Sequence, residues 1–207
     1  GIIMRIITIS REFGSGGREL GKRLAALLGY DYYDKEIILT IAKNKNLSET
    51  YVAALLENHG WKNIPLTFRS SFSAAAPSMQ TALLIEQKTV IEEIADAGKD
   101  CIIIGRSADT LLKRYHPFNI FVCADVEAKV ARCMQRASES EGLTRREIQQ
   151  KMRSIDKGRA KVRELIGGEA WGSRTAYHLT VNTTQWNIKD LTPAVKEFAD
   201  RWFGRTL

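Results

Sequence analysis

Apolar residues along this chain follow two different periods. In some short segments they occupy consecutive positions, and in longer segments they recur every three or four residues. Consecutive apolar residues over the length of a strand indicate a strand that is buried on both faces, whereas the longer period is typical of a helix with one buried face. The first pattern predicts five strands, at residues 2–9, 30–33, 101–104, 119–123 and 179–181.

The helical period occupies most of the remaining chain. It predicts helices at residues 18–28, 35–45, 48–58, 79–97 and 126–139, then a basic helix that starts after residue 144, and a closing helix that ends near residue 202.

Residues that favour helix ends mark several of these boundaries. Gly29 follows the first helix, and glycine readily adopts the left-handed conformation that ends a helix. Asp34 is a candidate N-cap for the second. The Thr-Arg-Arg-Glu sequence at 144–147 is a capping box. In such a box the threonine hydroxyl accepts a bond from the glutamate backbone amide, and the glutamate carboxylate accepts a bond from the threonine backbone amide. We expect the last helix to start at Thr192 and Pro193, because proline is accepted in a first helical turn.

The order of the elements predicts the fold class. Apolar strands that alternate with helices favour a parallel sheet with helices on both sides. We therefore predict an α/β protein, a three-layer α/β/α sandwich with a mainly parallel five-stranded sheet, in one domain over residues 1–207. Residues 60–79 follow neither period and are rich in Ser, Ala and Pro. They predict a long loop that either covers a substrate or is simply mobile.

Composition agrees with a globular protein, at 44% hydrophobic and 27% charged residues. No apolar stretch approaches the roughly 20 residues that a membrane span needs, and no leader segment is evident at the amino terminus. We expect a cytoplasmic protein with no membrane partner. The three cysteines and three histidines show no metal-ligand spacing, so we interpret Cys101, Cys123 and Cys133 as reduced packing residues.

The net charge of +7 favours anionic partners. Much of the excess lies in one segment, because residues 144–166 contain eight Lys or Arg and three acidic residues. A solvated helix face usually mixes the two signs more evenly.

A glycine-rich loop follows the first predicted strand, in the sequence ISREFGSGGRELG at 9–21. Such a loop exposes backbone N–H groups beside the positive end of a helix, and together these form an anion cradle. Gly14, Ser15, Gly16 and Gly17 would form that cradle. The alternative is a glycine turn that serves packing alone.

The loop departs from the Gly-x-x-x-x-Gly-Lys pattern of nucleotide-binding loops. On that pattern Arg11 takes the place of the first glycine and Gly17 the place of the lysine. The missing charge could come from Arg18, our first candidate, or from Arg11, since arginine binds phosphate oxygens bidentately. Glu19 could hold Mg²⁺ in place of the usual hydroxyl.

This opening segment resembles the cytidylate kinase-like family, a branch of the P-loop nucleoside monophosphate kinases with an altered SR-x-x-GSGGR loop. The resemblance continues through IIIGRSAD, NIFVCAD, MRSIDKGRAKVREL and YHLTVNTT, and so covers most of the chain. It implies a P-loop nucleoside kinase-like fold and ATP-dependent phosphoryl transfer to a nucleoside monophosphate of the CMP or dCMP type, with ATP and Mg²⁺. It also implies a helical substrate-side insertion at about 34–97 and a basic LID at about 140–175.

The same resemblance implies roles for acceptor-side residues. Asp34 stands where the family begins its monophosphate-binding helix, although it could equally serve only as a cap. Arg106 stands in the family's GRD sequence and would hold the acceptor phosphate, or could instead be an ordinary ion-pair partner. The aspartate of that sequence is Ser107 here, with Asp109 two residues further on, which leaves the preference for cytidine open.

One face of the basic helix gathers charged residues. At about 100° per residue, Asp156, Arg159 and Arg163 lie within about 60° of one another, and Arg153 widens the arc to about 120°. This arrangement resembles the LID arginines of nucleoside monophosphate kinases, which close over the donor. We therefore predict Arg18, Arg153, Arg159 and Arg163 as catalytic residues, and Asp156 as a residue on the substrate side.

Two other functions fit parts of the sequence. The missing lysine and the Ser107 change are compatible with a nucleotide-binding protein that has weak or no kinase activity. The basic helix could bind nucleic acid, but it lacks interleaved aromatic residues, so we do not expect that partner. We expect nucleotides as small-molecule partners, and self-association as a homodimer stays open.

Overall fold

The computed structural model describes residues 4–43, 77–136 and 142–206 of the chain. A five-stranded parallel sheet lies at its centre, with the strand order β2-β3-β1-β4-β5. The strands are β1 (Ile6–Arg11), β2 (Asp31–Tyr33), β3 (Cys101–Ile104), β4 (Phe118–Cys123) and β5 (Leu179–Asn182).

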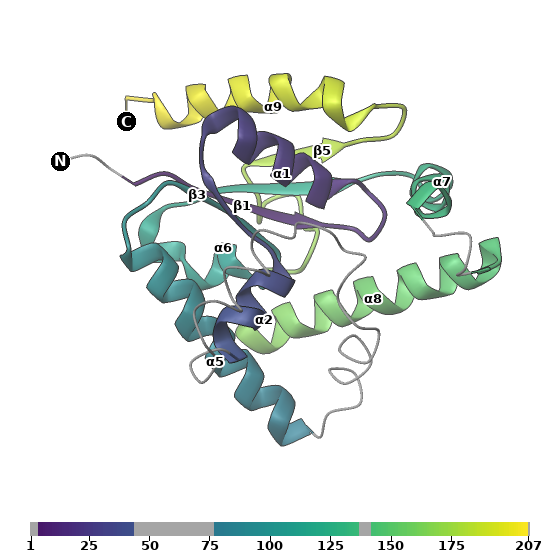
Figure 1. Cartoon of the computed structure of the whole chain (residues 1–207), viewed down its shortest axis with the longest axis horizontal. Coiled ribbons are helices and arrows are strands. Elements are labelled where there is room, and N and C mark those ends of the chain that lie inside the picture. Colours follow the sequence, from purple (N-terminus) through teal and green to yellow (C-terminus); the bar gives the residue numbers. More distant parts are fainter. Residues whose placement is uncertain (1–3, 44–76, 137–141, 207) are drawn as a thin grey trace.

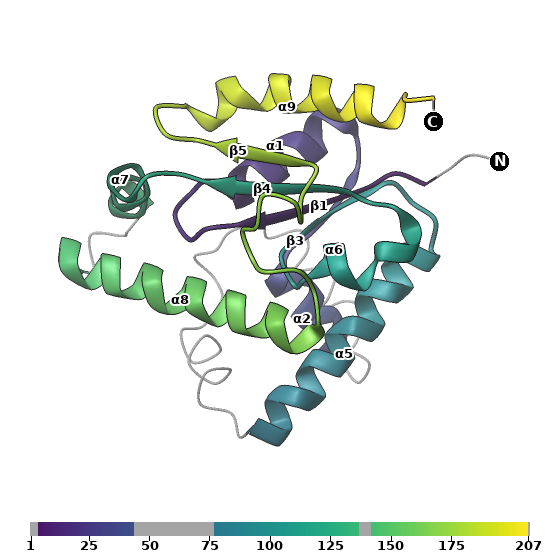
Figure 2. The same ribbon diagram turned by 180° about the vertical axis from the view of Figure 1, so that it is seen from behind.

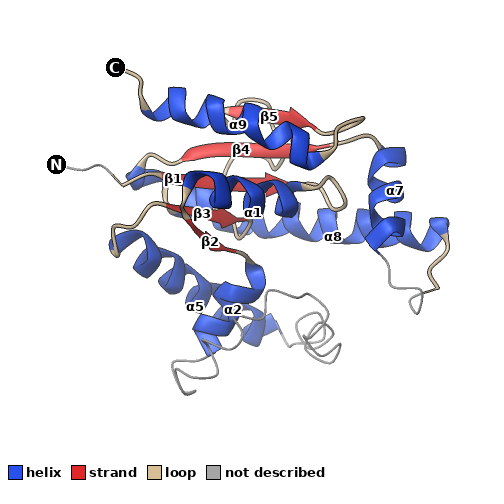
Figure 3. Cartoon of the chain, turned by 45° about the horizontal axis from the view of Figure 1, so that its top comes forward, coloured by secondary structure: helices blue, strands red, loops and turns tan. Residues whose placement is uncertain are grey.

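Helices cover both faces of the sheet (Figures 1 and 2). α1 and α9 lie on one face, and α2, α5, α6 and α8 lie on the other, while α7 stands beyond the carboxyl ends of the strands (Figure 3). Their bounds are α1 (Gly17–Leu28), α2 (Lys35–Lys43), α5 (Pro77–Asp96), α6 (Ala108–Leu111), α7 (Val126–Arg136), α8 (Arg145–Ile166) and α9 (Ile188–Phe203), with a short 3₁₀ helix, η3 (Lys113–Tyr115), after α6. The predicted three-layer sandwich is confirmed.

Alternate residues of the central strands supply two separate cores. On β1, Ile7 and Ile9 face α1 and α9, whereas Ile6 faces α5 and α6. On β3, Ile102 and Ile104 face the first of these layers, and Cys101 and Ile103 the second. Each such side chain is almost fully buried and contributes about 1.5–3 kcal/mol by leaving water. This explains why β3 is apolar at every position and why β1 has isoleucines on both of its faces.

Most predicted boundaries lie close to the observed ones. β3 has the predicted bounds, and the capping box at Thr144 and Glu147 is present at the start of α8. Gly29 ends α1 in the left-handed conformation, as predicted. The helix predicted at 48–58, and the 60–79 loop up to residue 76, lie outside the described residues; residues 77–79 belong to α5 instead.

Two predictions about elements are wrong, and two short helices were not predicted. β1 begins at Ile6, later than predicted, and it continues to Arg11 because its ladder with β4 extends to that residue. α9 begins at Ile188, where the Asn187 side chain accepts a bond from the Lys189 amide, so Pro193 lies inside the helix on its exposed side. The short helices α6 and η3 were not predicted, because segments of four and three residues are too short to show a helical period.

The described helices include none with the length and apolarity that a membrane crossing requires. The three cysteines are free thiols, and burial raises the pKa of Cys101 to about 12. Cys101 therefore behaves as a small core residue, as predicted.

Candidate functional site

The candidate site lies at the carboxyl edge of the sheet, where β1 ends between β3 and β4. The chain passes to one side of β1 to form β2 and β3, and then to the other side to form β4 and β5. Ligands of open α/β sheets bind at such a switch point, outside the carboxyl ends of the strands. The glycine-rich loop joins β1 to α1 at this position.

The loop keeps the backbone of an anion cradle. Gly14 and Gly16 have φ values of 81° and 85°, a left-handed conformation that side chains rarely adopt. Within the described residues, the N–H groups of Gly14, Gly16 and Gly17 have no protein acceptor. Ser15 is different, because its amide and its hydroxyl both donate to the Glu12 carbonyl, at 3.2 and 2.7 Å. Its role is to shape the turn.

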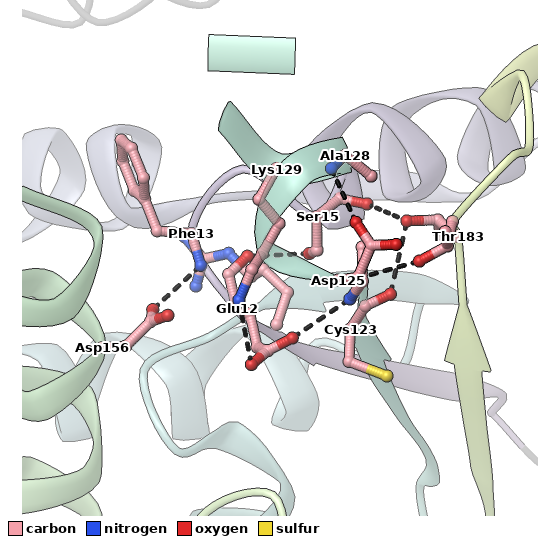
Figure 4. A network of polar contacts seen from close by, with 12 residues as sticks. Glu12, Phe13, Ser15, Cys123, Asp125, Ala128, Lys129, Asp156 and Thr183 are labelled. Atoms are coloured by element: carbon pink, nitrogen blue, oxygen red, sulfur yellow. Dashed lines mark hydrogen bonds and ion pairs between the residues drawn. The ribbon is translucent and has the colours of Figure 1, made fainter. Parts of the chain in front are cut away.

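Glu12 and Ser15 fasten this loop to the neighbouring strand ends (Figure 4). One carboxylate oxygen of Glu12 accepts a bond from the Ala124 amide at 3.1 Å, and the other lies 3.3 Å from the Lys129 ammonium group. The buried Thr183 hydroxyl donates to the Ser15 carbonyl at 2.5 Å. The loop is thus fixed from β4, α7 and the end of β5.

Arg132 of α7 adds a second fastening that the sequence analysis missed. Its guanidinium donates to the Ser15 carbonyl (3.2 Å), to the hydroxyl and carbonyl of Thr183 (2.9 and 2.6 Å), and to the Trp186 carbonyl (3.0 Å). Nothing in the pattern around residue 132 distinguishes it from the other charged residues of α7, so no sequence signal identifies it.

Three arginines from different elements converge beside the loop. They are Arg11 at the end of β1, Arg106 after β3, and Arg159 on α8. Burial and the charge of Arg159 lower the pKa of Arg11 to about 9, and burial and the charge of Arg11 lower the pKa of Arg106 to about 10. Burial also lowers the pKa of Arg159, with a further contribution from Arg106. Like charges held this close favour an anion between them.

Lys35, the first residue of α2, belongs to the same cluster. Burial and the nearby charge of Arg106 lower its pKa to about 8. With Arg18, Lys129 and Arg132, seven cations of the described residues surround the loop, against the four carboxylates of Glu12, Asp34, Glu36 and Asp156. The site therefore carries excess positive charge.

A strained turn holds Arg106 in place. Gly105, Arg106 and Ser107 have φ values of 66°, 57° and 51°, so three consecutive residues are left-handed. Such conformations persist where the surrounding structure enforces them, often at functional sites. The Arg106 guanidinium donates to the Gln87 side-chain oxygen at 3.0 Å, and the buried Gln87 amide nitrogen has no hydrogen-bond partner among the residues that the structure describes. Gln87 thus orients Arg106 through its side-chain oxygen, and its amide nitrogen can still donate a hydrogen bond to another group.

α8 is attached to the loop by two bonds to main-chain atoms. The Asp156 carboxylate accepts a bond from the Phe13 amide at 2.9 Å, and Arg159 donates to the Arg11 carbonyl at 3.0 Å. Asp156 and Arg159 also contact each other at 3.1 Å. The Phe13 ring packs against Val130, Ile148 and Met152.

Arg18, our first candidate for the missing charge, is directed toward the start of α2. Its guanidinium lies 2.8 Å from the Asp34 carboxylate and 3.6 Å from that of Glu36. The other carboxylate oxygen of Asp34 accepts a bond from the Ile37 amide at 3.1 Å. The prediction that Asp34 caps α2 is confirmed, and the same residue ties α2 to α1.

Arg163 and Asp109 form a separate buried ion pair. Their charged groups lie 2.8 Å apart, and each side chain is 4% exposed. Arg163 also donates to the Glu169 carbonyl. These two predicted site residues therefore engage each other, one helical turn beyond Arg159 on α8.

Arg153 is exposed and borders a pocket of about 520 Å³ between α7, α8 and the loop. The pocket is lined by Glu12, Val126, Lys129, Gln149, Met152, Arg153, Asp156 and Trp171. Of the four arginines predicted as catalytic, Arg159 reaches the loop, Arg18 and Arg163 form ion pairs, and Arg153 lies at the pocket edge.

The predicted magnesium ligand, Glu19, lies on the exposed side of α1. It contacts Arg23 at 3.6 Å and Arg136 at 3.3 Å. The described residues contain no group of three or more side chains suited to hold a metal.

Solved structures share this fold. An uncharacterized protein from Eubacterium ventriosum superimposes with a TM-score of 0.71 at 22% identity, covering 95% of this chain and 99% of that one. TT1252 from Thermus thermophilus gives 0.57 at 19% identity, with 96% and 97% coverage. The shikimate kinase from Acinetobacter baumannii in complex with shikimate gives 0.53 at 16% identity, with 98% and 96% coverage.

A search of curated protein sequences found no significant match. Among family models, that of the cytidylate kinase-like family matches residues 6–185, which include the loop, the three converging arginines and all five strands. The chain therefore belongs to the cytidylate kinase-like family.

Proposed function

We propose that this protein is a kinase that transfers a phosphoryl group from ATP to a nucleoside monophosphate, with CMP or dCMP as the first candidates. One observation carries the proposal. Arg11, Arg106 and Arg159 gather at the carboxyl edge of the sheet, where burial and neighbouring positive charge lower their pKa values, and the nearby loop amides have no acceptor among the described residues. Phosphoryl transfer needs such positive charge around the migrating group, with the reactants held in line.

On the donor side, the amides of Gly14, Gly16 and Gly17 would bind the phosphate chain of ATP. Arg159 would balance charge on the transferred group, since it reaches the loop from α8. Mg²⁺ bound with the nucleotide would neutralise further charge. The attachment of α8 to the loop supports residues 140–175 as a LID that excludes water from the reaction.

On the acceptor side, Arg106 and Lys35 would hold the phosphate of the monophosphate. Both lie at strand ends that face the loop, and Arg106 is oriented by Gln87. Asp34 keeps α2 in position through Arg18 and the Ile37 amide. We propose that residues 34–97 provide the remaining acceptor contacts. Ser107 in place of the family's aspartate leaves the base to be identified by experiment.

The test is a phosphoryl-transfer assay with Mg²⁺, ATP and single acceptors. CMP, dCMP, UMP and AMP are compared, with shikimate and water as acceptors without a phosphate. We expect ADP release that depends on a pyrimidine monophosphate, with the corresponding diphosphate identified by chromatography. Transfer to shikimate but to no monophosphate would overturn the choice of acceptor.

The second candidate is a nucleotide-binding protein with little or no turnover. It is favoured by the lack of a lysine in the loop and by the pairing of Arg18 with Asp34. Tight binding of Mg²⁺-ATP with no product from any acceptor would support it. RNA binding that weakens steeply with salt would instead point to the exposed cations of α8 as a nucleic-acid surface.

A further inference from the structure

The loop differs from the Gly-x-x-x-x-Gly-Lys pattern at two positions, and the structure relates them. Position 11 has arginine where the pattern has glycine, and position 17 has glycine where it has lysine. The two positions are six residues apart in sequence, at the end of β1 and the start of α1. In space they are in contact.

A side chain at position 17 would collide with Arg11. A Cβ atom added to Gly17 would lie 2.5 Å from the Arg11 Cβ and 2.8 Å from its Cγ. Carbon atoms in contact normally lie about 3.5–4.0 Å apart. Because these atoms are at the near end of the arginine, rotation of the side chain cannot relieve the overlap.

The backbone of Gly17 does not itself require glycine. Unlike Gly14 and Gly16, Gly17 is not left-handed, and it is the first residue of α1. Any residue could adopt its conformation. The contact with Arg11 is therefore the feature that excludes a side chain here.

The Arg11 side chain extends past Gly17, at the start of α1, toward Gly105, which follows β3. Its Nη1 atom lies 2.5 Å from the position that a Cβ atom on Gly105 would occupy, so a second glycine leaves room for the guanidinium. The guanidinium thus extends toward Gly105, and the charges of Arg106, Arg159 and Glu36 lie close to it. Arg18, the other candidate, is held by Asp34 and Glu36.

We propose that Arg11 is the phosphate-binding cation of this loop, moved from the helix start to the strand end, and that Gly17 is glycine because Arg11 occupies the space of the usual lysine. This inference rests on the proposed function, since it assigns the donor phosphates to the loop. The two departures from the pattern therefore belong together. The cation is at position 11 instead of position 17, and the glycine is at position 17 instead of position 11.

The experiment is a double-mutant cycle on Arg11→Gly, Gly17→Lys and the double variant, with Arg11→Ala and Arg11→Lys as further single variants. Binding of Mg²⁺-ATP is measured by calorimetry. We expect Arg11→Gly and Arg11→Ala to weaken binding by about 10- to 100-fold, as for loss of a charged hydrogen-bonding partner. Gly17→Lys alone should also weaken it, whereas the double variant should bind more tightly than either single one.

A second cycle measures the collision without any ligand. Gly17→Ala should lower Tm by about 5 °C in the presence of Arg11, as expected for overpacking in a protein of this size, and much less in the Arg11→Gly background. This readout holds even where Gly17→Lys fails to fold. Arg201→Ala, an exposed arginine near the end of α9, is the matched control for removal of a positive charge.

The outcomes separate the two proposals. Failure of the unmodified protein to bind Mg²⁺-ATP would refute the proposed function. Normal binding that Arg11→Ala leaves unchanged, or equal effects of Gly17→Ala in both backgrounds, would refute the exchange and leave the proposed function standing.

Discussion

Arg18 shows how the partners of one side chain change the role that its sequence position suggests. It stands one residue after the usual lysine position, so sequence reasoning favours it as the substitute. The structure pairs it with Asp34 and Glu36 instead. These partners come from the end of β2 and the start of α2, and no spacing rule relates them to the loop. The assignment of the loop's charge therefore needs three-dimensional contacts.

We expect Arg18→Ala to lower stability while Mg²⁺-ATP binding stays close to that of the unmodified protein. Asp34 is 4% exposed on its side chain and would lose its charged partner, at a cost of about 2 kcal/mol in the free energy of unfolding. Urea denaturation measures this loss, and the KM for the acceptor should rise because α2 is less firmly held. A large drop in Mg²⁺-ATP affinity would return Arg18 to the role of loop cation.

At the scale of elements, sequence signals within a single helix were informative, whereas contacts between distant segments could not be predicted. The capping box located the start of α8, and the 3.6-residue period placed Asp156 and Arg159 on one face, which the structure directs at the loop. The start of α9 was misplaced, because proline is also tolerated on the exposed side of a helix whose cap is Asn187. Arg132 could not be predicted, since all its acceptors are backbone or hydroxyl groups from distant segments.

The attachment of α8 predicts a measurable effect of Asp156→Ala. Loss of the carboxylate removes the acceptor of the Phe13 amide, so we expect that amide to exchange with solvent about 10- to 100-fold faster. Hydrogen–deuterium exchange over the loop measures it. Glu164→Ala removes an exposed acidic residue from the same helix and serves as the control. Unchanged protection of Phe13 would show that other contacts hold α8 against the loop.

Over the whole molecule, the parallel sheet determines where charge is concentrated. All five strands end at the same edge, and the residues that follow them bring Arg11, Lys35 and Arg106 together although they are far apart in sequence. The alternation of strands and helices predicts that such an edge exists. It does not predict which cations face one another, because side-chain directions after each strand depend on turns such as the left-handed one at 105–107.

This cluster predicts a pH dependence of anion binding. The pKa of Lys35 is lowered to about 8, so its charge is lost as pH rises above that value in the folded state, while the unfolded chain keeps its proton up to about 10.5. Between about pH 8 and 10.5 this group makes the ligand-free fold more stable with rising pH, and weakens anion binding over the same range.

Sulfate is the suitable probe, because its charge is constant over this range. We expect the sulfate-induced increase in Tm to decline between about pH 7 and pH 9.5, and Lys35→Met to remove that decline. A sulfate effect that is independent of pH would place Lys35 outside the anion site.

The contacts between α8 and the loop have a consequence for sequence variation. Both bonds end on main-chain atoms of the loop, the Phe13 nitrogen and the Arg11 oxygen. A relative could therefore replace the side chains at both positions and still present the same two atoms to the helix. These two bonds would therefore produce no correlated substitutions between the loop and α8. Only the helix partners, Asp156 and Arg159, would have to be retained.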